Sequence, residues 1–222
     1  IIEDMLQDKH GKKLVDMTCK DFAEETASES PAPGGGSISA YMGALAAALG
    51  TMVANLSAHK AGWDDRWEEF SDVAEKGHEI QDRLIALVDE DTEAFNRIMD
   101  VFAMPKKTPE EKEARAKALE AATLYATEVP LRTMQAAYDT FDVLEAMASK
   151  GNPASVSDAG VGALAARSAV LGAHLNVRIN AAGLKDREKA EVILTAASVI
   201  ASAAINREMQ ILGIVDKVID KE

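Results

Sequence analysis

The sequence predicts an all-α fold, a single-domain multihelical bundle of about seven helices over residues 1–222. Apolar residues recur every three or four positions along nearly the whole chain, and sustained period-two alternation of β-branched and aromatic residues is absent. Proline and glycine signals divide the chain into helical stretches joined by short loops, and no linker separates two domains. Two of the expected helices are rich in Gly and Ala, which indicates close helix packing.

The N-terminal part is expected to hold two helices on either side of a proline-glycine loop. Thr18 is a suitable N-cap for a short first helix, with Asp21 in its first turn. The segment Pro31-Ala-Pro-Gly-Gly-Gly-Ser37 ends that helix, because its prolines and glycines do not continue a helix. A second helix is then expected from about 37 to 59.

The middle of the chain is expected to hold three helices. The third helix runs from about 64 to 104 and stops at Pro105. Thr108-Pro-Glu-Glu111 has the pattern of a capping box with proline at the first helical position, so it predicts the start of a fourth helix. Because Pro130 lacks an amide hydrogen, we expect a kink or a new start there, with a fifth helix continuing to Lys150.

The last part of the chain is expected to hold two more helices. Ser155 and Ser157 are candidate caps for a sixth helix that runs through Asn180 to Gly183. A seventh helix is expected from about 186 to 218.

Composition limits the partners and the location of the protein. Lys and Arg number 24 and Asp and Glu 37, so the formal charge is −13, which disfavours nucleic acid and anionic membrane surfaces. The uncharged segment 30–59 is long enough to span a bilayer, but Ala and Gly dominate it and interfacial anchors are missing, so we expect a buried helix. One cysteine, Cys19, and no leader pattern at the start favour a cytoplasmic location.

One acid lies on an otherwise apolar face of the third helix. Asp91 completes a stripe formed by Leu84, Val88, Phe95, Ile98 or Met99, and Phe102. Burial raises the pKa of a carboxyl group, which suits proton transfer near neutral pH. The alternative role is a structural acid paired with an arginine.

A second acid, Asp158, begins a stripe of tiny residues and amides on the sixth helix: Gly162, Ala165, Ala169, Gly172, Asn176 and Asn180. The two ends lie about 33 Å apart at 1.5 Å per residue, so one small substrate cannot touch both. Either the ligand is long, or one end packs while the other binds, or an antiparallel partner subunit brings opposite ends together. Asp158 also suits the first turn of its helix, where an acid stabilises the helix dipole.

The motifs of several other site classes are missing from the sequence. The four histidines include no i, i+4 pair, so we expect no metal site. The glycine loop lacks the lysine and the preceding strand of a phosphate-binding loop, and no nucleophile elbow is present. The loop can still hold a ligand against a helix N-terminus, or it can serve packing alone.

Several short segments occur in one order along the chain: Pro31–Ser37 with Met52–Leu56, Asp91–Phe95, Met104–Lys106 with Glu111 and Arg115, Val129–Pro130, Ser157–Gly160 and Asn176–Asn180. Together they resemble the cyclodeaminase domain of the formimidoyltransferase-cyclodeaminase family, from about residue 27 to 186. The resemblance implies an all-α homodimer that acts on tetrahydrofolates without a tightly bound cofactor. It also implies a formimidoyltransferase domain or protein as a possible partner.

The reaction implied by this resemblance is the closure of 5-formimidoyltetrahydrofolate to 5,10-methenyltetrahydrofolate with loss of ammonia, in histidine degradation and one-carbon metabolism. Asp91 and Asp158 are the implied proton carriers. The implied substrate-binding residues are Pro33, Gly34, Gly35, Gly36, Ser37, Asn55, Lys60, Lys106, Asn176 and Asn180. Of these, Asn176 and Asn180 are pterin-orienting or helix-bridging amides.

Two other functions fit the same residues. The family includes methenyltetrahydrofolate cyclohydrolases, which add water to the same carbon, and a helical dimer that binds folate or a protein without turnover is the alternative from another class. The chain also departs from the family where a basic run is expected after Leu56, because Ser57–Trp63 keeps one lysine, Lys60. Lys60, Lys106, Arg132 and Arg178 are the candidate substitutes for binding an acidic glutamate tail.

Overall fold

The computed structural model describes residues 13–221, and within that range it is all α-helical with no strand, which confirms the predicted fold class. Its α-helices are α2 (Cys19–Thr26), α3 (Gly35–Ala58), α4 (Trp67–Ala103), α5 (Pro109–Lys150), α6 (Val156–Ala181) and α7 (Arg187–Ile219). Three short 3-10 turns lie between them: η1 (Leu14–Asp16), η2 (Asp64–Arg66) and η3 (Pro153–Ser155).

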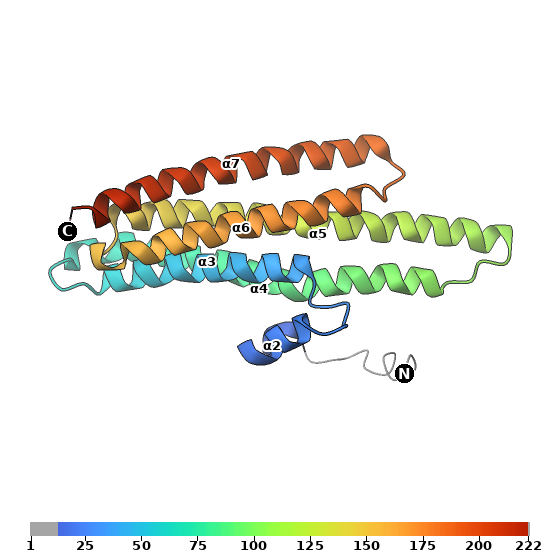
Figure 1. The fold of residues 1–222 in the computed structure, drawn as a ribbon, viewed down its shortest axis with the longest axis horizontal. Helices are drawn as coiled ribbons and strands as arrows, with labels where there is room; N and C mark the ends of the chain where they lie inside the picture. The colour runs from blue at the N-terminus through green and yellow to red at the C-terminus, as the bar shows by residue number, and fades with distance from the viewer. Residues whose placement is uncertain (1–12, 222) are drawn as a thin grey trace.

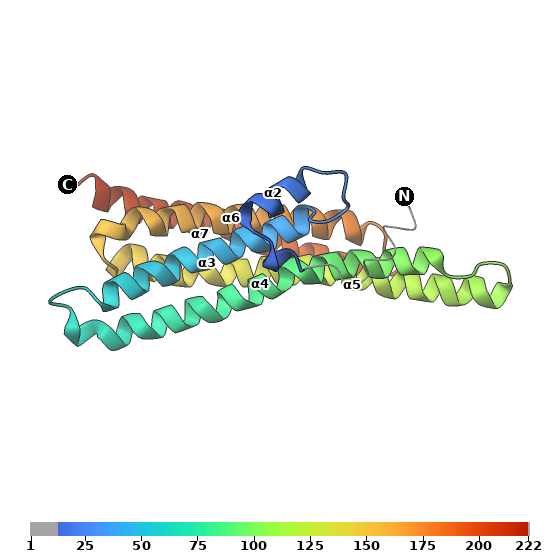
Figure 2. The ribbon, with the colours of Figure 1, turned by 90° about the horizontal axis from the view of Figure 1, so that it is seen from below.

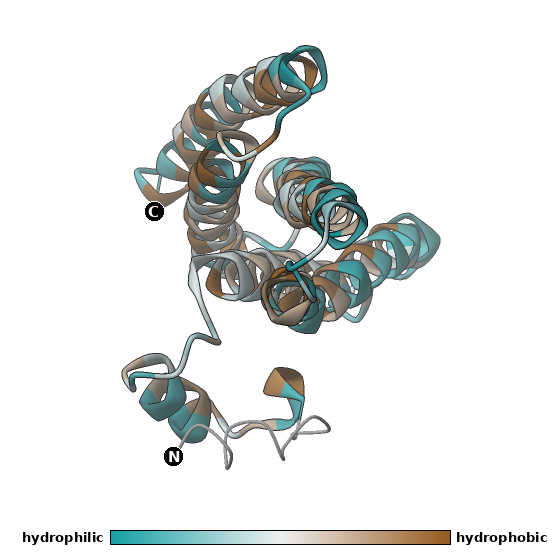
Figure 3. Ribbon diagram, turned by 90° about the vertical axis from the view of Figure 1, so that its right-hand side faces the viewer, coloured by the Kyte–Doolittle hydropathy of each residue, from teal (hydrophilic) through white to brown (hydrophobic). Residues whose placement is uncertain are grey.

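Five long helices lie side by side along the long axis of the molecule (Figures 1 and 2). The central helix α3 packs against α4, α5 and α6, while α7 packs against α5 and α6. In contrast, α2 stands apart from the bundle (Figure 3) and buries none of its residues. Its Phe22 ring contacts Tyr41 of α3, with centroids 5.4 Å apart.

The uncharged segment forms the central helix of this bundle. By length and composition, α3 is one helix that could cross a membrane, with a mean hydropathy of 1.5 over its most apolar window. In the fold, 56% of that window is buried against the neighbouring helices. This burial agrees with the expectation that the segment is a core helix.

Small residues on α6 let the neighbouring helices approach closely. A β-carbon at Gly172 would overlap the hydroxyl of Ser39 on α3, and one at Gly162 would overlap the side chain of Leu144 on α5. Because interiors are close-packed, a methyl group at either position would have to displace the side chain that it meets. The small-residue face of α6 therefore serves packing against α3 and α5.

The prediction of two helices meeting at Pro130 was wrong. α5 is one continuous helix of 42 residues with Pro130 inside it, which lowers the number of α-helices in residues 13–221 to six. Pro130 has no amide hydrogen to donate to the carbonyl of Ala126, four residues earlier. Instead, the Asn180 side chain of α6 donates from Nδ2 to that carbonyl, at 2.6 Å. A contact between helices thus replaces the missing bond within α5.

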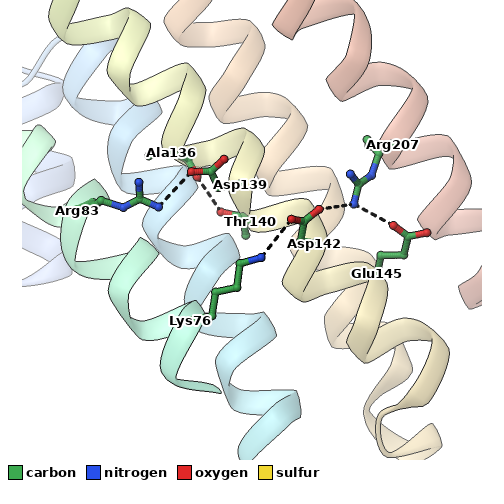
Figure 4. Close-up of polar contacts among 8 residues, drawn as sticks. All are labelled: Lys76, Arg83, Ala136, Asp139, Thr140, Asp142, Glu145 and Arg207. Atoms are coloured by element: carbon green, nitrogen blue, oxygen red, sulfur yellow. Dashed lines mark hydrogen bonds and ion pairs between the residues drawn. The ribbon is translucent and has the colours of Figure 1, made fainter. Parts of the chain in front are cut away.

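Ion pairs hold α5 between α4 and α7 on the outer side of the bundle (Figure 4). Asp142 of α5 binds Lys76 of α4 at 3.1 Å and Arg207 of α7 at 3.0 Å, and Arg207 also binds Glu145 at 2.9 Å. Isolated exposed pairs contribute little to stability, but here one partly buried arginine joins two acids of a network.

Loss of the Asn180 amide should destabilise the fold through the Ala126 carbonyl. We expect Asn180→Ala to lower the free energy of unfolding by about 1–3 kcal/mol, because it leaves a carbonyl without a donor. In a Pro130→Ala background residue 130 supplies that donor, so the same substitution should cost less. Chemical denaturation of the wild type, the two single variants and the double variant measures the coupling free energy between residues 130 and 180. Equal losses in both backgrounds would contradict the proposed link.

Candidate functional site

A pocket lies where the proline-glycine loop enters α3. Five segments line it: Pro31, Ala32 and Gly34 of the loop, Gly35 and Gly36 of α3, Asp91, Thr92, Ala94, Phe95 and Ile98 of α4, Ala126 of α5, and Asn176 and Asn180 of α6. Four parts of the chain that are far apart in sequence, 31–36, 91–98, 126 and 176–180, meet here at the N-terminus of α3.

The Asp91 side chain binds the first turn of α3. Its Oδ2 accepts hydrogen bonds from the backbone amide of Ser37 at 2.9 Å and from the Ser37 hydroxyl at 3.1 Å. Amides in the first turn of a helix have no partner within the helix, so Asp91 satisfies one of them from outside. The contact also needs Gly36, because a β-carbon there would overlap the Asp91 carboxyl group.

Burial raises the pKa of Asp91 above its ordinary value, and the two hydrogen bonds from Ser37 partly oppose that shift. Among the described residues Asp91 forms no ion pair with an arginine or lysine, so the alternative role as an Arg-paired structural acid finds no support in this fold. Both Ser37 bonds go to Oδ2, which makes Oδ1 the oxygen that can carry a proton. The pocket therefore contains a carboxyl group suited to proton transfer.

Asp91 marks the boundary between the core and the open part of α4. Leu84 and Val88 before it are buried, as the apolar stripe predicts. Beyond Asp91 the expected core face was only partly right, because Ile98 is half-buried and packs against the core while Phe95, Met99 and Phe102 are exposed. Of these, Phe95 forms a wall of the pocket with Ile98.

The two asparagines of α6 reach the same pocket. Asn176 donates from Nδ2 to the carbonyl of Gly172 at 3.0 Å and faces Gly35, whose added β-carbon would lie 3.4 Å from that nitrogen. Asn180 bridges α6 and α5 through Ala126. Asn180 therefore has the helix-bridging role, while Asn176 faces the glycine loop.

Two predicted loop residues are close to the pocket but buried. Ser37 is fully buried and uses its amide and hydroxyl on Asp91. Pro33 is also buried and follows a cis peptide bond after Ala32. Among the predicted loop residues, Gly34, Gly35 and Gly36 are the ones that line the pocket.

The remaining predicted site residues lie elsewhere in the single chain. Asp158 is in the first turn of α6, about 27 Å from Asn176 at 1.5 Å per residue. Asn55 lines a separate groove near the end of α3, and Lys60 lies over the Trp63 ring, 4.0 Å from its centroid. Lys106 is exposed in the turn between α4 and α5. One chain therefore does not bring Asp91 and Asp158 together.

The other two basic candidates, Arg132 and Arg178, are not among the residues that line the pocket. Arg132 binds both carboxylate oxygens of Glu90, at 3.0 and 2.6 Å, and this pairing lowers the pKa of Glu90. Arg178 is exposed near the end of α6. Within residues 13–221, no group of three or more His, Cys, Asp or Glu is placed to hold a metal ion.

Sequence reasoning missed part of the pocket wall. Thr92, Phe95, Ile98 and Ala126 line it, yet periodicity assigned Phe95 and Ile98 to the core and gave no role to Ala126. The hydroxyl of Thr92 is buried without a hydrogen-bond partner in the described part of the chain. The sequence held one signal for Thr92, because it directly follows Asp91 in the segment Asp91–Phe95 that resembles the family.

The site therefore defines an all-α protein in which a half-buried carboxyl group and a glycine-rich helix start share one pocket. The family model described as formiminotransferase-cyclodeaminase matches residues 18–199. The chain therefore belongs to the formiminotransferase-cyclodeaminase family, as its sequence segments predicted. This family of cyclodeaminases and cyclohydrolases acts on tetrahydrofolate derivatives.

Similar proteins of known name carry two different activities. A methenyltetrahydrofolate cyclohydrolase of Methylorubrum extorquens is 40% identical over 78% of this chain and 84% of its own length. The formimidoyltransferase-cyclodeaminase of Gallus gallus is 36% identical over 85% of this chain, which spans 35% of that longer protein. The crystal structure of formiminotetrahydrofolate cyclodeaminase from Thermotoga maritima matches with a TM-score of 0.74 and 26% identity, covering 93% of this chain and 97% of that one.

Two neighbouring glycines provide a matched test of the Asp91 contact. Gly36→Ala should displace the Asp91 carboxyl group and lower the free energy of unfolding by about 1–3 kcal/mol, because the Ser37 bonds are lost. Gly35→Ala has room for its methyl group and should be neutral or stabilising by up to about 1 kcal/mol. Denaturant unfolding of both variants measures the difference. A Gly36→Ala protein as stable as wild type would contradict the close contact.

The raised pKa of Asp91 predicts a pH-dependent effect on stability. Because the folded state binds the proton more tightly than the unfolded state, ionisation of Asp91 destabilises the fold as pH rises through its raised pKa. Asp91→Asn should therefore have a higher melting temperature than wild type at about pH 8. The difference between the two melting temperatures should shrink as pH falls toward about 4. Thermal unfolding across this range measures it, with Glu93→Gln as the exposed-acid control. A gap that widens on acidification would contradict the assignment.

Proposed function

We propose that the protein closes 5-formimidoyltetrahydrofolate to 5,10-methenyltetrahydrofolate and releases ammonia. The observation that carries this proposal is the half-buried Asp91 carboxyl group of raised pKa, which lines the pocket of a chain in the cyclodeaminase family. The homodimer and the cytoplasmic location implied by the sequence resemblance belong to the same proposal. So does a role for Asn176 in orienting the pterin ring.

The proposed chemistry needs positioning and proton transfer. N10 of the substrate attacks the formimidoyl carbon and forms the new C–N bond, while protonated Asp91 donates its Oδ1 proton to the formimidoyl nitrogen. Ionised Asp91 then takes the proton from N10 and passes it to the amino nitrogen, so that the C–N bond to this nitrogen breaks, ammonia departs and the methenyl cation remains. One carboxyl group of raised pKa can deliver the first proton and, once ionised, accept another. Ser37 keeps the other oxygen in place throughout.

The pocket walls suit a flat heteroaromatic ring with polar edges. Phe95 and Ile98 contribute apolar surface to the pocket, and Asn176 and the glycine backbone contribute polar groups. Ligand sites commonly combine apolar walls with a few polar groups that orient the ligand. This combination supports a pterin as the bound group.

Methenyltetrahydrofolate cyclohydrolase activity is the second candidate. It is favoured by the 40% identity to the Methylorubrum extorquens enzyme over 84% of that protein's length. In that reaction water adds to the methenyl carbon, Asp91 in its ionised form would take a proton from the water, and the bond from this carbon to one of the two folate nitrogens then breaks as that nitrogen receives the proton. Both reactions place the same one-carbon unit beside the same carboxyl group.

One spectroscopic experiment separates the candidate functions. Purified protein receives 5-formimidoyltetrahydrofolate in one cuvette and 5,10-methenyltetrahydrofolate in another, and the methenyl absorbance is followed. Its appearance in the first cuvette supports the cyclodeaminase, and its disappearance above the spontaneous rate in the second supports the cyclohydrolase. No change in either cuvette would refute both enzymatic proposals and favour a non-catalytic folate- or protein-binding dimer.

Replacing Asp91 by a residue that cannot transfer a proton should reduce turnover and leave the fold intact. We expect Asp91→Asn to lower kcat at least about tenfold, the low end of what a positioned proton carrier contributes. Glu93→Gln, an exposed acid on the same helix that pairs with Arg97, should keep wild-type kcat. Steady-state kinetics on the active substrate measure both variants. Equal kcat for Asp91→Asn and wild type would remove Asp91 from the mechanism.

A further inference from the structure

One hydroxyl group at the pocket has no hydrogen-bond partner within the described chain. Thr92 follows Asp91 on α4 and lines the same pocket, and the residue is half-buried. Its Oγ1 is shielded from solvent, yet it bonds to no other group in residues 13–221. A buried polar atom without a partner destabilises a fold, so such atoms are uncommon in native proteins.

Hydroxyl groups on the neighbouring helices use a local acceptor that Thr92 does not use. Ser39 of α3 and Thr127 and Thr140 of α5 each donate to the carbonyl four residues earlier, at 2.7, 2.8 and 3.3 Å. The same bond from Thr92 would go to the carbonyl of Val88, and it is not formed in the described structure. A turn about the Cα–Cβ bond of Thr92 therefore breaks no hydrogen bond.

The other polar side chains of the pocket already have partners. Asp91, Asn176 and Asn180 all form hydrogen bonds within the chain. Among the side chains that line the pocket, Thr92 is the one with a hydroxyl group, which can donate one hydrogen bond. A ligand with a carbonyl at its edge would give this hydroxyl the acceptor that the described chain does not provide.

The position of Thr92 beside Asp91 indicates which edge of a pterin it can reach. In the proposed reaction Asp91 serves the one-carbon unit on N5. The C4 carbonyl lies on the same side of the ring, because C4 and N5 are both bonded to C4a. Consecutive residues of a helix lie about 100° apart around its axis, so two neighbouring side chains of α4 can contact neighbouring groups of one ligand.

We propose that the Thr92 hydroxyl donates a hydrogen bond to the C4 carbonyl oxygen of the bound pterin and so determines the ring edge that the pocket accepts. This inference rests on the proposed function. Phe95 and Ile98 supply apolar contact, which does not distinguish one ring edge from another. A hydroxyl bonded to one carbonyl fixes the orientation of the ring toward Asp91. Thr92 orients the ligand and transfers no proton.

Equilibrium binding of 5-formyltetrahydrofolate tests this contact without turnover. This folate has oxygen in place of the imino nitrogen of the proposed substrate and keeps the C4 carbonyl. Thr92→Val removes the hydroxyl at nearly constant shape and should raise Kd about 5- to 50-fold, because the carbonyl loses its donor. Thr92→Ser keeps the hydroxyl, so its Kd should lie within about threefold of wild type. Equal Kd values for Thr92→Val and wild type would overturn the inference.

Stability distinguishes a ligand-binding hydroxyl from a structural one. Thr92→Val removes a buried polar atom without a partner, so its melting temperature without ligand should equal or exceed that of wild type. Thr140 does not line the pocket and donates to Ala136, so Thr140→Val should have a lower melting temperature and an unchanged Kd. A Thr92→Val protein that matches Thr140→Val in both measurements would show a structural hydroxyl and overturn the inference.

Infrared difference spectra identify the ligand atom that Thr92 contacts. A hydrogen bond to a carbonyl oxygen lowers the stretching frequency of that carbonyl. With an isotopic label at C4 of the bound folate, the carbonyl band should therefore lie at higher frequency in Thr92→Val than in wild type. An unchanged band would overturn the assignment to the C4 carbonyl.

These measurements separate the Thr92 contact from the proposed function. A wild type that binds 5-formyltetrahydrofolate and converts neither folate refutes the proposed function, while a raised Kd of Thr92→Val still supports the contact. An active wild type whose Thr92→Val variant keeps the wild-type Kd overturns the contact alone. In an active enzyme, Thr92→Val should chiefly raise KM, whereas Asp91→Asn should lower kcat.

Discussion

The contact between Asp91 and the first turn of α3 is the interaction on which the site depends. It joins an acid of α4 to an otherwise unpaired amide of α3, and it forms because residue 36 has no side chain. The same contact places a carboxyl group of raised pKa at a pocket wall. One side chain therefore makes a structural contact and, in the proposed function, carries the transferred proton.

A second hydrogen bond between helices holds the part of the pocket wall that α5 and α6 form. Pro130 leaves the carbonyl of Ala126 without a helical donor, and Asn180 supplies one from α6. Because Ala126 and Asn180 both line the pocket, this bond sets the distance between α5 and α6 beside the site. The close packing of Gly172 against Ser39 and of Gly162 against Leu144 sets the position of α6 against α3 and α5. The pocket is therefore built from contacts between helices.

Periodicity predicted the all-α class and singled out Asp91, because an amphipathic stripe is a local property of the chain. Asp91 interrupts such a stripe, and its burial follows from that position. Pro130 shows where local reasoning fails, since its helical penalty is offset by Asn180, 50 residues away. The exposure of Phe95 and Met99 likewise depends on where α3 begins and α6 ends, which no local pattern records.

By itself the sequence determined the all-α class, the glycine-rich entry to α3, the acid on α4 and the family, since each is carried by residue type and short spacing. Only the tertiary structure decided which candidates share a pocket. It brought Asp91, Gly35, Gly36, Asn176 and Asn180 together and left Asp158, Asn55, Lys60 and Lys106 at other places. The physical reason is that a helix holds its residues at fixed distances of about 1.5 Å per residue along its axis. The way the helices pack therefore decides which of their residues come together in one pocket.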